Sequence, residues 1–306
     1  MSNKTKDLRF AVVGAGAVGC YFGGILARAG HHVTLIGRPH HVSAIQQHGL
    51  LLTTQQFEEH IPLHASTELA AIQEADVILF CVKSTDTITT AEQAKPYLST
   101  DAVILSLQNG VENAELIRSV LSHQVIPAVV YVATEMVGDG HVKHNGRGEL
   151  VIGASSASEL IAEVLTAAAI PTQVSDNVIG ALWAKLIVNC AYNALSAITQ
   201  LPYGQLVLQE GVPTMMEELI VECLAVASAG GVVVPGDSRE NVKQIARSMA
   251  EQTSSTAQDL ARGKRSEIDY LNGYVCRQGQ KYHVPTPVNH TLTSLVKMLE
   301  KTSAHQ

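Results

Sequence analysis

Short apolar runs alternate with helical patterns through the first half of the chain. Strands that are buried on both faces are predicted at residues 8–13, 32–36, 76–82 and 102–107. Helical spacing of apolar positions predicts helices at 17–29 and 85–97. Such strands are typical of a parallel sheet covered by helices on both sides. A run at 125–134, a Gly-Asp-Gly turn and a returning segment at 141–145 predict a terminal hairpin, with one more strand at 148–153.

The pattern changes near Ser175, where long helical stretches punctuated by proline and glycine replace the strands. Asp176 or Asn177 is a candidate N-cap for a helix that runs to about Thr199. Further helices are predicted at 211–229, 237–252, 269–280 and 287–300. The sequence therefore predicts an α/β domain with a mainly parallel sheet at residues 1–176, followed by an all-α domain at 177–306.

Composition and charge exclude several classes of protein. Of the 306 residues, 46% are hydrophobic and 16% are charged, which excludes a disordered chain. The formal net charge of -7 argues against a nucleic-acid or anionic-membrane partner. Polar residues interrupt the best apolar stretch, 180–198, and residues 1–9 are polar, so neither a spanning helix nor a signal peptide is predicted. Five cysteines without a paired spacing indicate reduced thiols and a cytoplasmic location.

A glycine-rich turn joins the first predicted strand to the first predicted helix. Its residues are Gly14, Ala15, Gly16, Ala17, Val18 and Gly19. In a turn of this spacing the first glycine permits the tight turn, the second lets a pyrophosphate approach the backbone, and the third lets helix and strand pack closely. Because the required strand and helix flank the motif, we expect residues 14–19 to bind a dinucleotide and the first domain to be Rossmann-type.

The end of the second predicted strand indicates which dinucleotide binds. A site for NAD places a carboxylate here to accept from the ribose 2′-hydroxyl. This chain instead reads Ile36-Gly37-Arg38, and the Arg38 guanidinium suits a 2′-phosphate. NADP(H) is therefore the expected cofactor. The histidine pairs, His40-His41 included, lack the cysteine or carboxylate spacing of a zinc site, so no metal is expected.

Two polar positions follow later predicted strands. Lys83 comes directly after the 76–82 run, and Asn109 with Gly110 follows the 102–107 run. Ligands of open α/β sheets bind beyond the carboxyl ends of the strands. We therefore expect Lys83 and Asn109 to lie beside the nicotinamide half of the cofactor, although Asn109-Gly110 also suits an ordinary turn.

The apolar helix predicted near 177–199 carries three polar side chains at helical spacing. Lys185, Asn189 and Asn193 lie four residues apart, so they share one helix face. An ammonium on so apolar a helix is unfavourable unless it faces a site or a partner, and burial would lower its pKa toward the range useful for proton transfer. A lysine that extends its charge to solvent, beside two amides that bond nearby backbone, is the alternative interpretation.

A second polar cluster spans residues 254–259 and 263–269. Its serines can hold a carboxylate through hydroxyl and backbone N–H groups, and either Glu267 or Asp269 can face a substrate hydroxyl. The same spacing suits capping of helix ends, so the residues alone leave both interpretations open.

Together these segments resemble the 2-dehydropantoate 2-reductase (ketopantoate reductase) family over essentially the whole chain. The similar motifs, in order, are GAGAVG at 14–19, Lys83, QNG at 108–110, WAKLIVNCAYN at 183–193, SSTAQD at 254–259, SEIDYLNG at 266–273 and PTPVN at 285–289. The resemblance implies NADPH-dependent reduction of a small 2-oxo acid, ketopantoate, to (R)-pantoate on the route to pantothenate and coenzyme A. The expected partners are the small 2-oxo acid and a second copy of the chain in a homodimer.

The resemblance also implies a role for each matching residue. Lys185 would be the general acid that protonates the carbonyl oxygen as hydride arrives. Asn189 and Asn193 would bind substrate oxygens, and Ser255 would bind near the substrate carboxylate. Glu267 would bridge substrate and cofactor hydroxyls. The cofactor would further contact Lys83, Asn109 and Arg38.

One position departs from the family pattern. Some members carry an asparagine that contacts substrate just before a glycine, where this chain has Tyr203-Gly204. We therefore expect Tyr203 to border the substrate and to change which 2-oxo acid fits. A paralogous reductase of another 2-oxo acid, a dehydrogenase of the 3-hydroxyisobutyrate type and a non-catalytic NADPH sensor are the alternative functions.

Overall fold

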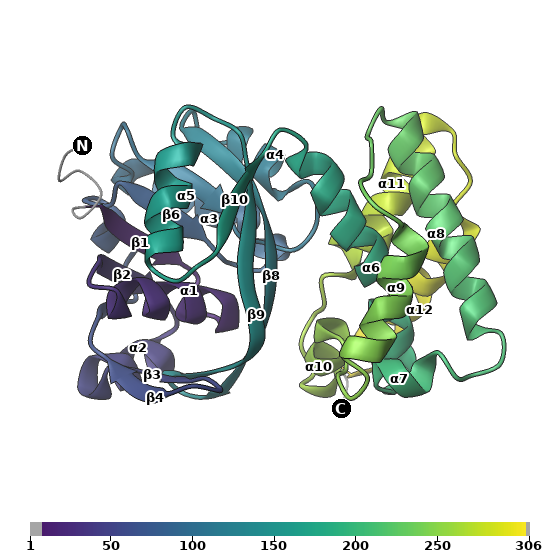
Figure 1. Ribbon diagram of the computed structural model, residues 1–306, viewed down its shortest axis with the longest axis horizontal. Helices are drawn as coiled ribbons and strands as arrows, with labels where there is room; N and C mark the ends of the chain where they lie inside the picture. The colour runs from purple at the N-terminus through teal and green to yellow at the C-terminus, as the bar shows by residue number, and fades with distance from the viewer. Residues whose placement is uncertain (1–7, 304–306) are drawn as a thin grey trace. The chain divides into compact units, whose positions relative to one another are not determined.

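The computed structural model describes residues 8–303, which fall into two compact units (Figure 1). The first unit contains the chain up to Gln108 together with Glu112–Val178. The second contains Asn109–Val111 and the chain from Ile179 onward. A three-residue loop of the first half of the sequence therefore packs with the second unit.

A ten-stranded sheet forms the centre of the first unit. Its strands are β1 (Arg9–Val13), β2 (His32–Ile36), β3 (Leu50–Thr53), β4 (Glu58–Ile61), β5 (His64–Ser66), β6 (Val77–Phe80), β7 (Val103–Ser106), β8 (Gln124–Gly138), β9 (His141–Gly153) and β10 (Thr172–Ser175). They run in the order β4-β3-β9-β8-β7-β6-β1-β2-β5, with β10 beside β9. The pairs β3–β4 and β8–β9 are antiparallel and the others are parallel, which confirms the predicted α/β class with a mainly parallel sheet.

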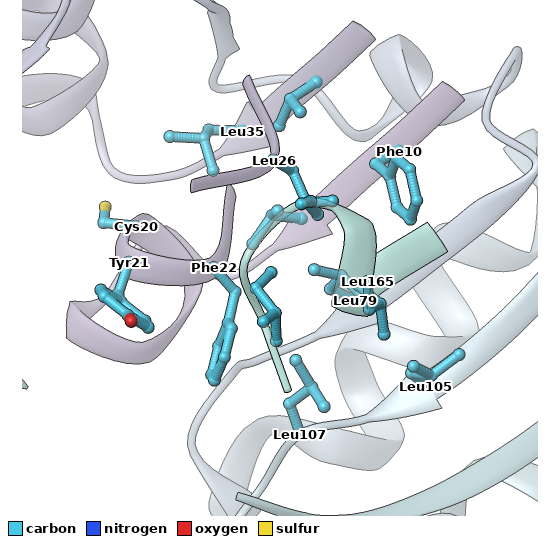
Figure 2. Close-up of a cluster of buried hydrophobic side chains, with 14 of the residues drawn as sticks. Phe10, Cys20, Tyr21, Phe22, Leu26, Leu35, Leu79, Leu105, Leu107 and Leu165 are labelled. Atoms are coloured by element: carbon cyan, nitrogen blue, oxygen red, sulfur yellow. The ribbon is translucent and has the colours of Figure 1, made fainter. Parts of the chain in front are cut away.

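Side chains alternate between two buried faces of this sheet. Phe10 and Val12 of β1 belong to one core cluster, whereas Ala11 and Val13 belong to another. The first cluster joins α1 to the central strands, as Figure 2 shows for Phe22 and its neighbours. Burial on both faces explains why these strands read as continuous apolar runs in the sequence.

In the described part of the first unit, from residue 8 on, the sheet is accompanied by the α-helices α1 (Ala17–Arg28), α2 (Pro39–His48), α3 (Thr87–Ala94), α4 (Asn113–Arg118) and α5 (Ser158–Ala167). The single helix predicted at 85–97 is shorter, because 3-10 turns at Ser84–Asp86 and Lys95–Tyr97 flank α3. The predicted hairpin is present but longer, since β9 is one continuous strand that includes the segment predicted separately at 148–153.

Helices make up the second unit, which confirms the predicted all-α class. They are α6 (Val178–Thr199), α7 (Tyr203–Leu206), α8 (Val212–Ala229), α9 (Ser238–Ser248), α10 (Ser255–Ala261), α11 (Asn272–Tyr282) and α12 (Pro287–Ser303). By length and composition α6 is the one helix among the described residues that passes as a membrane span, but 67% of its apolar window is buried within the protein. It is accordingly typical of a core helix.

Candidate functional site

The glycine-rich loop follows β1 and leads into α1. Gly14 has φ +110°, and a Cβ there would lie 2.7 Å from the Cys81 carbonyl carbon. A Cβ on Gly19 would lie 2.2 Å from the Gly14 oxygen. A Cβ on Gly16 would meet no protein atom within 4 Å. The first and third glycines therefore let helix and strand pack closely, and the second borders open space beside the N-terminus of α1, as a pyrophosphate site requires.

Arg38 lies at the carboxyl end of β2, where it precedes the first turn of α2. Its side chain is exposed, and its backbone is the N-cap of α2 without a side-chain cap. Residues 36–41 contain no carboxylate. This end of the strand therefore offers a helix N-terminus without a side-chain cap and a guanidinium, both suited to an anion.

A surface group that the sequence did not predict lies next to Arg38. The side chains of His40, His41 and Asp139 place one ligand atom each within 4.8 Å of one another. However, His41 Nδ1 already accepts a hydrogen bond from the Gly140 N–H at 3.2 Å. This bond links α2 to the β8–β9 turn.

A buried amide and hydroxyl network fixes the loops after β6 and β7. Gln108 Nε2 donates to the Val82 carbonyl at 3.1 Å and to Thr87 Oγ1 at 2.7 Å. Thr87 Oγ1 in turn donates to Asn113 Oδ1, and Asn113 Nδ2 donates to Ser84 Oγ. These bonds hold the 3-10 turn at Ser84–Asp86 against the loop before Asn109. The exposed Lys83 directly precedes that turn, three residues after the end of β6. Sequence reasoning missed this role, although Gln108 belonged to a motif it singled out.

Lys185 and Asn109 meet directly, 76 positions apart in the sequence. Lys185 Nζ donates to Asn109 Oδ1 at 2.9 Å. Both side chains are half-buried, and both residues belong to the second unit. The sequence predicted a role for each residue but not this pairing. The Asn109 amide oxygen is a neutral acceptor that orients the Lys185 ammonium.

Asn189 and Asn193 continue the same face of α6. Asn189 is half-buried and Asn193 is 5% exposed. Within residues 8–303 no hydrogen bond is found for either side-chain amide. Amides without an internal partner, aligned with an ammonium, are available to bind the oxygens of a small ligand.

The 254–259 segment packs against this helix. Ser254 Oγ donates to the Asn193 carbonyl at 3.1 Å and accepts from the Ala257 N–H at 3.0 Å, so Ser254 both caps α10 and anchors it to α6. Ser255, the predicted substrate contact, is the exposed first residue of α10.

Glu267 and Asp269 occupy different surroundings. Glu267 is 8% exposed at the start of a short 3-10 turn. Asp269 accepts a hydrogen bond from Lys297 Nζ at 2.6 Å and lies 3.6 Å from Arg265. The structure thus separates two acids that the sequence left equivalent: Asp269 is paired with surface cations and Glu267 is buried.

Tyr203 begins α7 and is 9% exposed. Its ring lies 4.7 Å from that of Tyr192, which donates a hydrogen bond to the Val242 carbonyl. Burial raises the pKa of Tyr203 well above its usual range, so its phenol stays neutral. A role at the substrate remains a prediction.

Comparisons with known proteins cover nearly the whole chain. A family model described as ketopantoate reductase PanE/ApbA matches residues 10–157, and its C-terminal counterpart matches residues 177–300. The 2-dehydropantoate 2-reductase of Pyrococcus horikoshii is 32% identical over 298 residues, which cover 96% of this chain and 98% of that protein. The enzyme of the same name from Vibrio cholerae is 31% identical over 301 residues, or 96% and 98% of the two chains.

Two solved structures are similar in fold. A PanE/ApbA family ketopantoate reductase from Ralstonia eutropha JMP134 superposes with a TM-score of 0.96 at 57% identity, covering 97% of this chain and 100% of that one. D-mandelate dehydrogenase, in a ternary structure with NADH and anilino(oxo)acetate, gives a TM-score of 0.90 at 25% identity, with 97% and 99% coverage.

Proposed function

Because the chain belongs to the ketopantoate reductase family of oxidoreductases, we propose that it reduces 2-dehydropantoate (ketopantoate) to (R)-pantoate with NADPH. In this proposal residues 1–176 bind the dinucleotide and residues 177–306 supply the substrate and catalytic groups. The product would enter pantothenate and coenzyme A synthesis, and the reaction would take place in the cytoplasm.

The residues of the first unit fit a dinucleotide. The open space at Gly16 and the uncapped N-terminus of α1 suit a pyrophosphate, and Arg38 suits a 2′-phosphate. Lys83, together with Asn109 of the second unit, would lie beside the nicotinamide. When bound, NADPH supplies the hydride that adds to the carbonyl carbon of the substrate.

The pairing of Lys185 with Asn109 is the observation that carries the proposal. Hydride addition leaves negative charge on the carbonyl oxygen, which needs a proton and electrostatic stabilisation. The Lys185 ammonium would give that proton and would regain one from solvent after the product leaves. Asn189 and Asn193 would orient the substrate, Ser255 would bind its carboxylate end, and Glu267 would accept from a hydroxyl.

The test is oxidation of NADPH by the purified protein on addition of ketopantoate, with NADH as the comparison cofactor. Loss of a charge-assisted contact to phosphate weakens an interaction by about 10- to 150-fold. The kcat/KM with NADPH should therefore exceed the kcat/KM with NADH by about that factor. Arg38→Ala should remove most of this preference. Equal efficiency with NADH would refute the NADP assignment. Binding of NADPH without turnover of ketopantoate or of other small 2-oxo acids would identify a sensor instead.

The identity of the 2-oxo acid is tested in the same assay. The similarity to D-mandelate dehydrogenase makes phenylglyoxylate, the 2-oxo acid that corresponds to mandelate, the natural competitor. Ketopantoate should give the higher kcat/KM, and the Tyr203→Asn variant shows whether Tyr203 sets this ranking. A higher kcat/KM for phenylglyoxylate would assign the chain to the aromatic substrate.

A further inference from the structure

A chain of buried polar side chains crosses the second unit and ends on the backbone of α6. The Glu222 carboxylate of α8 accepts from the N–H groups of Val288 (2.8 Å) and Asn289 (3.0 Å) and from Asn289 Nδ2 (2.7 Å). Asn289 Oδ1 accepts from Asn272 Nδ2 at 3.0 Å, and the same Nδ2 donates to the Cys190 carbonyl at 3.2 Å. We call these groups the Glu222 relay. It joins α8, α12, α11 and α6.

Helix capping explains only the first part of this relay. The N–H groups of Val288 and Asn289 belong to the first turn of α12, where a carboxylate satisfies unpaired donors and complements the helix dipole. Asn272 and Asn289 are 0% exposed, and the two bonds donated by Asn272 Nδ2 continue the network through the core from Asn289 to α6. Capping of α12 requires neither of these side-chain bonds.

The side-chain amide of Asn272 is oriented so that its Nδ2 makes two hydrogen bonds while its Oδ1 makes none within residues 8–303. Its Oδ1 is buried and has no hydrogen-bond partner among the described residues. An unpaired buried acceptor is unfavourable. Reversing the amide would place that oxygen against the Cys190 carbonyl and Asn289 Oδ1, so the two acceptors fix the amide as a donor. The fold therefore tolerates one unpaired oxygen to keep the bond to α6.

The hydrogen bond from Asn272 reaches the turn of α6 that lies between the candidate ligand-binding residues Asn189 and Asn193. Cys190 follows Asn189 directly and lies five positions after Lys185. In an α-helix its carbonyl is the acceptor for the N–H four residues ahead, so the Asn272 amide is a second donor from another helix. On the next turn Ser254 Oγ binds the Asn193 carbonyl in the same manner. Two neighbouring elements thus fix the position of the turn that carries the candidate ligand-binding amides.

We propose that Asn272, oriented by Asn289 and Glu222, is a positioning residue that holds this turn of α6 for the chemistry at Lys185. The catalytic part of this inference rests on the proposed function of Lys185. The structural part, that Asn272 holds the turn, rests on the hydrogen bonds of the relay alone. A catalytic group must be placed closely, because a shift of about 1 Å caused by a distant mutation can reduce the rate about 100-fold.

The test compares Asn272→Ala with Thr293→Val. Thr293 Oγ1 donates to the Asn289 carbonyl at 2.8 Å within α12, so its loss removes a half-buried bond next to the relay without touching α6. Asn272→Ala should lower kcat by about 10- to 100-fold with an unchanged affinity for NADPH, and amides 189–194 should exchange hydrogen faster. Thr293→Val should change neither kcat nor this exchange by more than about twofold, whatever its melting temperature.

A second variant protects the test against a failure to fold. Glu222→Gln keeps the size of the side chain, but its NH2 group must face a hydrogen-bond donor in either orientation, the Val288 N–H or the N–H and Nδ2 of Asn289, which should disturb the relay at its far end and lower kcat in the same direction. Parental kcat and parental exchange of 189–194 in either variant would overturn the proposal, even if the variant melts earlier. If the parent reduces no 2-oxo acid, the proposed function fails. The exchange comparison then decides the relay alone: faster exchange in Asn272→Ala than in Thr293→Val supports it, and equal exchange overturns it.

Discussion

At the scale of single residues, an amide holds the lysine on which the proposed chemistry depends. Lys185 Nζ donates a hydrogen bond to Asn109 Oδ1 at 2.9 Å. Lys185→Ala should lower kcat by about 10²–10⁴-fold, the usual contribution of a positioned general acid, while NADPH binding stays near normal. Lys185→Arg should restore little, since a guanidinium does not give up its proton at accessible pH.

The matched control is Lys297→Ala, which removes a lysine of the same unit that binds Asp269 at the surface. Its kcat should stay within about twofold of the parent. Steady-state kcat at saturating NADPH decides the question, and a loss of less than about tenfold in Lys185→Ala would make Lys185 a binding or structural residue.

Burial also separates two acids only two positions apart. Glu267 is 8% exposed, whereas Asp269 binds Lys297 and lies near Arg265 at the surface. Glu267→Ala should therefore lower kcat/KM for the 2-oxo acid at least tenfold more than Asp269→Ala, on the order of one lost charged hydrogen bond. Equal and small effects would remove Glu267 from the candidate site.

At the scale of elements, the β1–α1 loop assigns different tasks to its glycines. Gly19→Ala would place a Cβ 2.2 Å from the Gly14 oxygen and 2.8 Å from Val12 Cγ1, so α1 must move away from β1. A decrease of about 1–3 kcal/mol in the free energy of unfolding is expected from such overpacking. Gly16→Ala meets no protein atom, so stability should be unchanged and NADPH affinity should fall, because the new methyl group lies where the ligand approaches the backbone.

Thermal melting and titration of NADPH fluorescence measure the two effects in parallel. The prediction fails if Gly16→Ala binds NADPH as tightly as the parent protein, which would leave the loop with a packing role alone.

The elements also show what a single sequence can reveal. β1 and β6 were predicted because both of their faces are buried, which makes their sequences continuously apolar. β4 was missed because three of its four residues are exposed and polar, as suits a strand at the end of a sheet. Its pairing with β3 depends on distant parts of the chain, which periodicity does not record.

The candidate site likewise has features that the sequence predicted and contacts that it did not. The glycine loop and the Lys185 face of α6 were visible because their spacing is local. The two bonds donated by Gln108 Nε2 and the pairing of Lys185 with Asn109 were not, because each joins segments more than 20 residues apart. An amide in a sequence does not show whether it will bind a ligand, as proposed for Asn189, or another side chain, as Asn272 does.

At the scale of the whole molecule, buried protonated groups in both units make stability sensitive to alkaline pH. Burial raises the pKa of Cys20 in the first unit and of Tyr192 in the second to about 12, and it raises the pKa of Cys190 as well. Unfolding exposes these groups, which then release protons at lower pH than in the folded state. The unfolded state therefore binds fewer protons, and stability falls as pH rises past the thiol pKa of the unfolded chain, about 8.5.

Each buried thiol should contribute a decline of about 1.4 kcal/mol per pH unit above that value. Urea denaturation from about pH 8 to pH 10 measures the decline, and Cys20→Ala should reduce its slope by about one thiol's share. A free energy of unfolding that does not change over this range would contradict the burial of these groups.

The loop Asn109–Val111 has a consequence for recombination between relatives. It packs with the second unit but is encoded upstream of α6, so the acceptor for the Lys185 ammonium lies in the other half of the gene. A chimaera joined at residue 177 would take its lysine from one parent and the acceptor from the other. A crossover there can therefore exchange the partner of Lys185 while leaving every residue of the helical half unaltered. A library of such hybrids should retain activity only where the incoming first half carries a compatible amide at position 109.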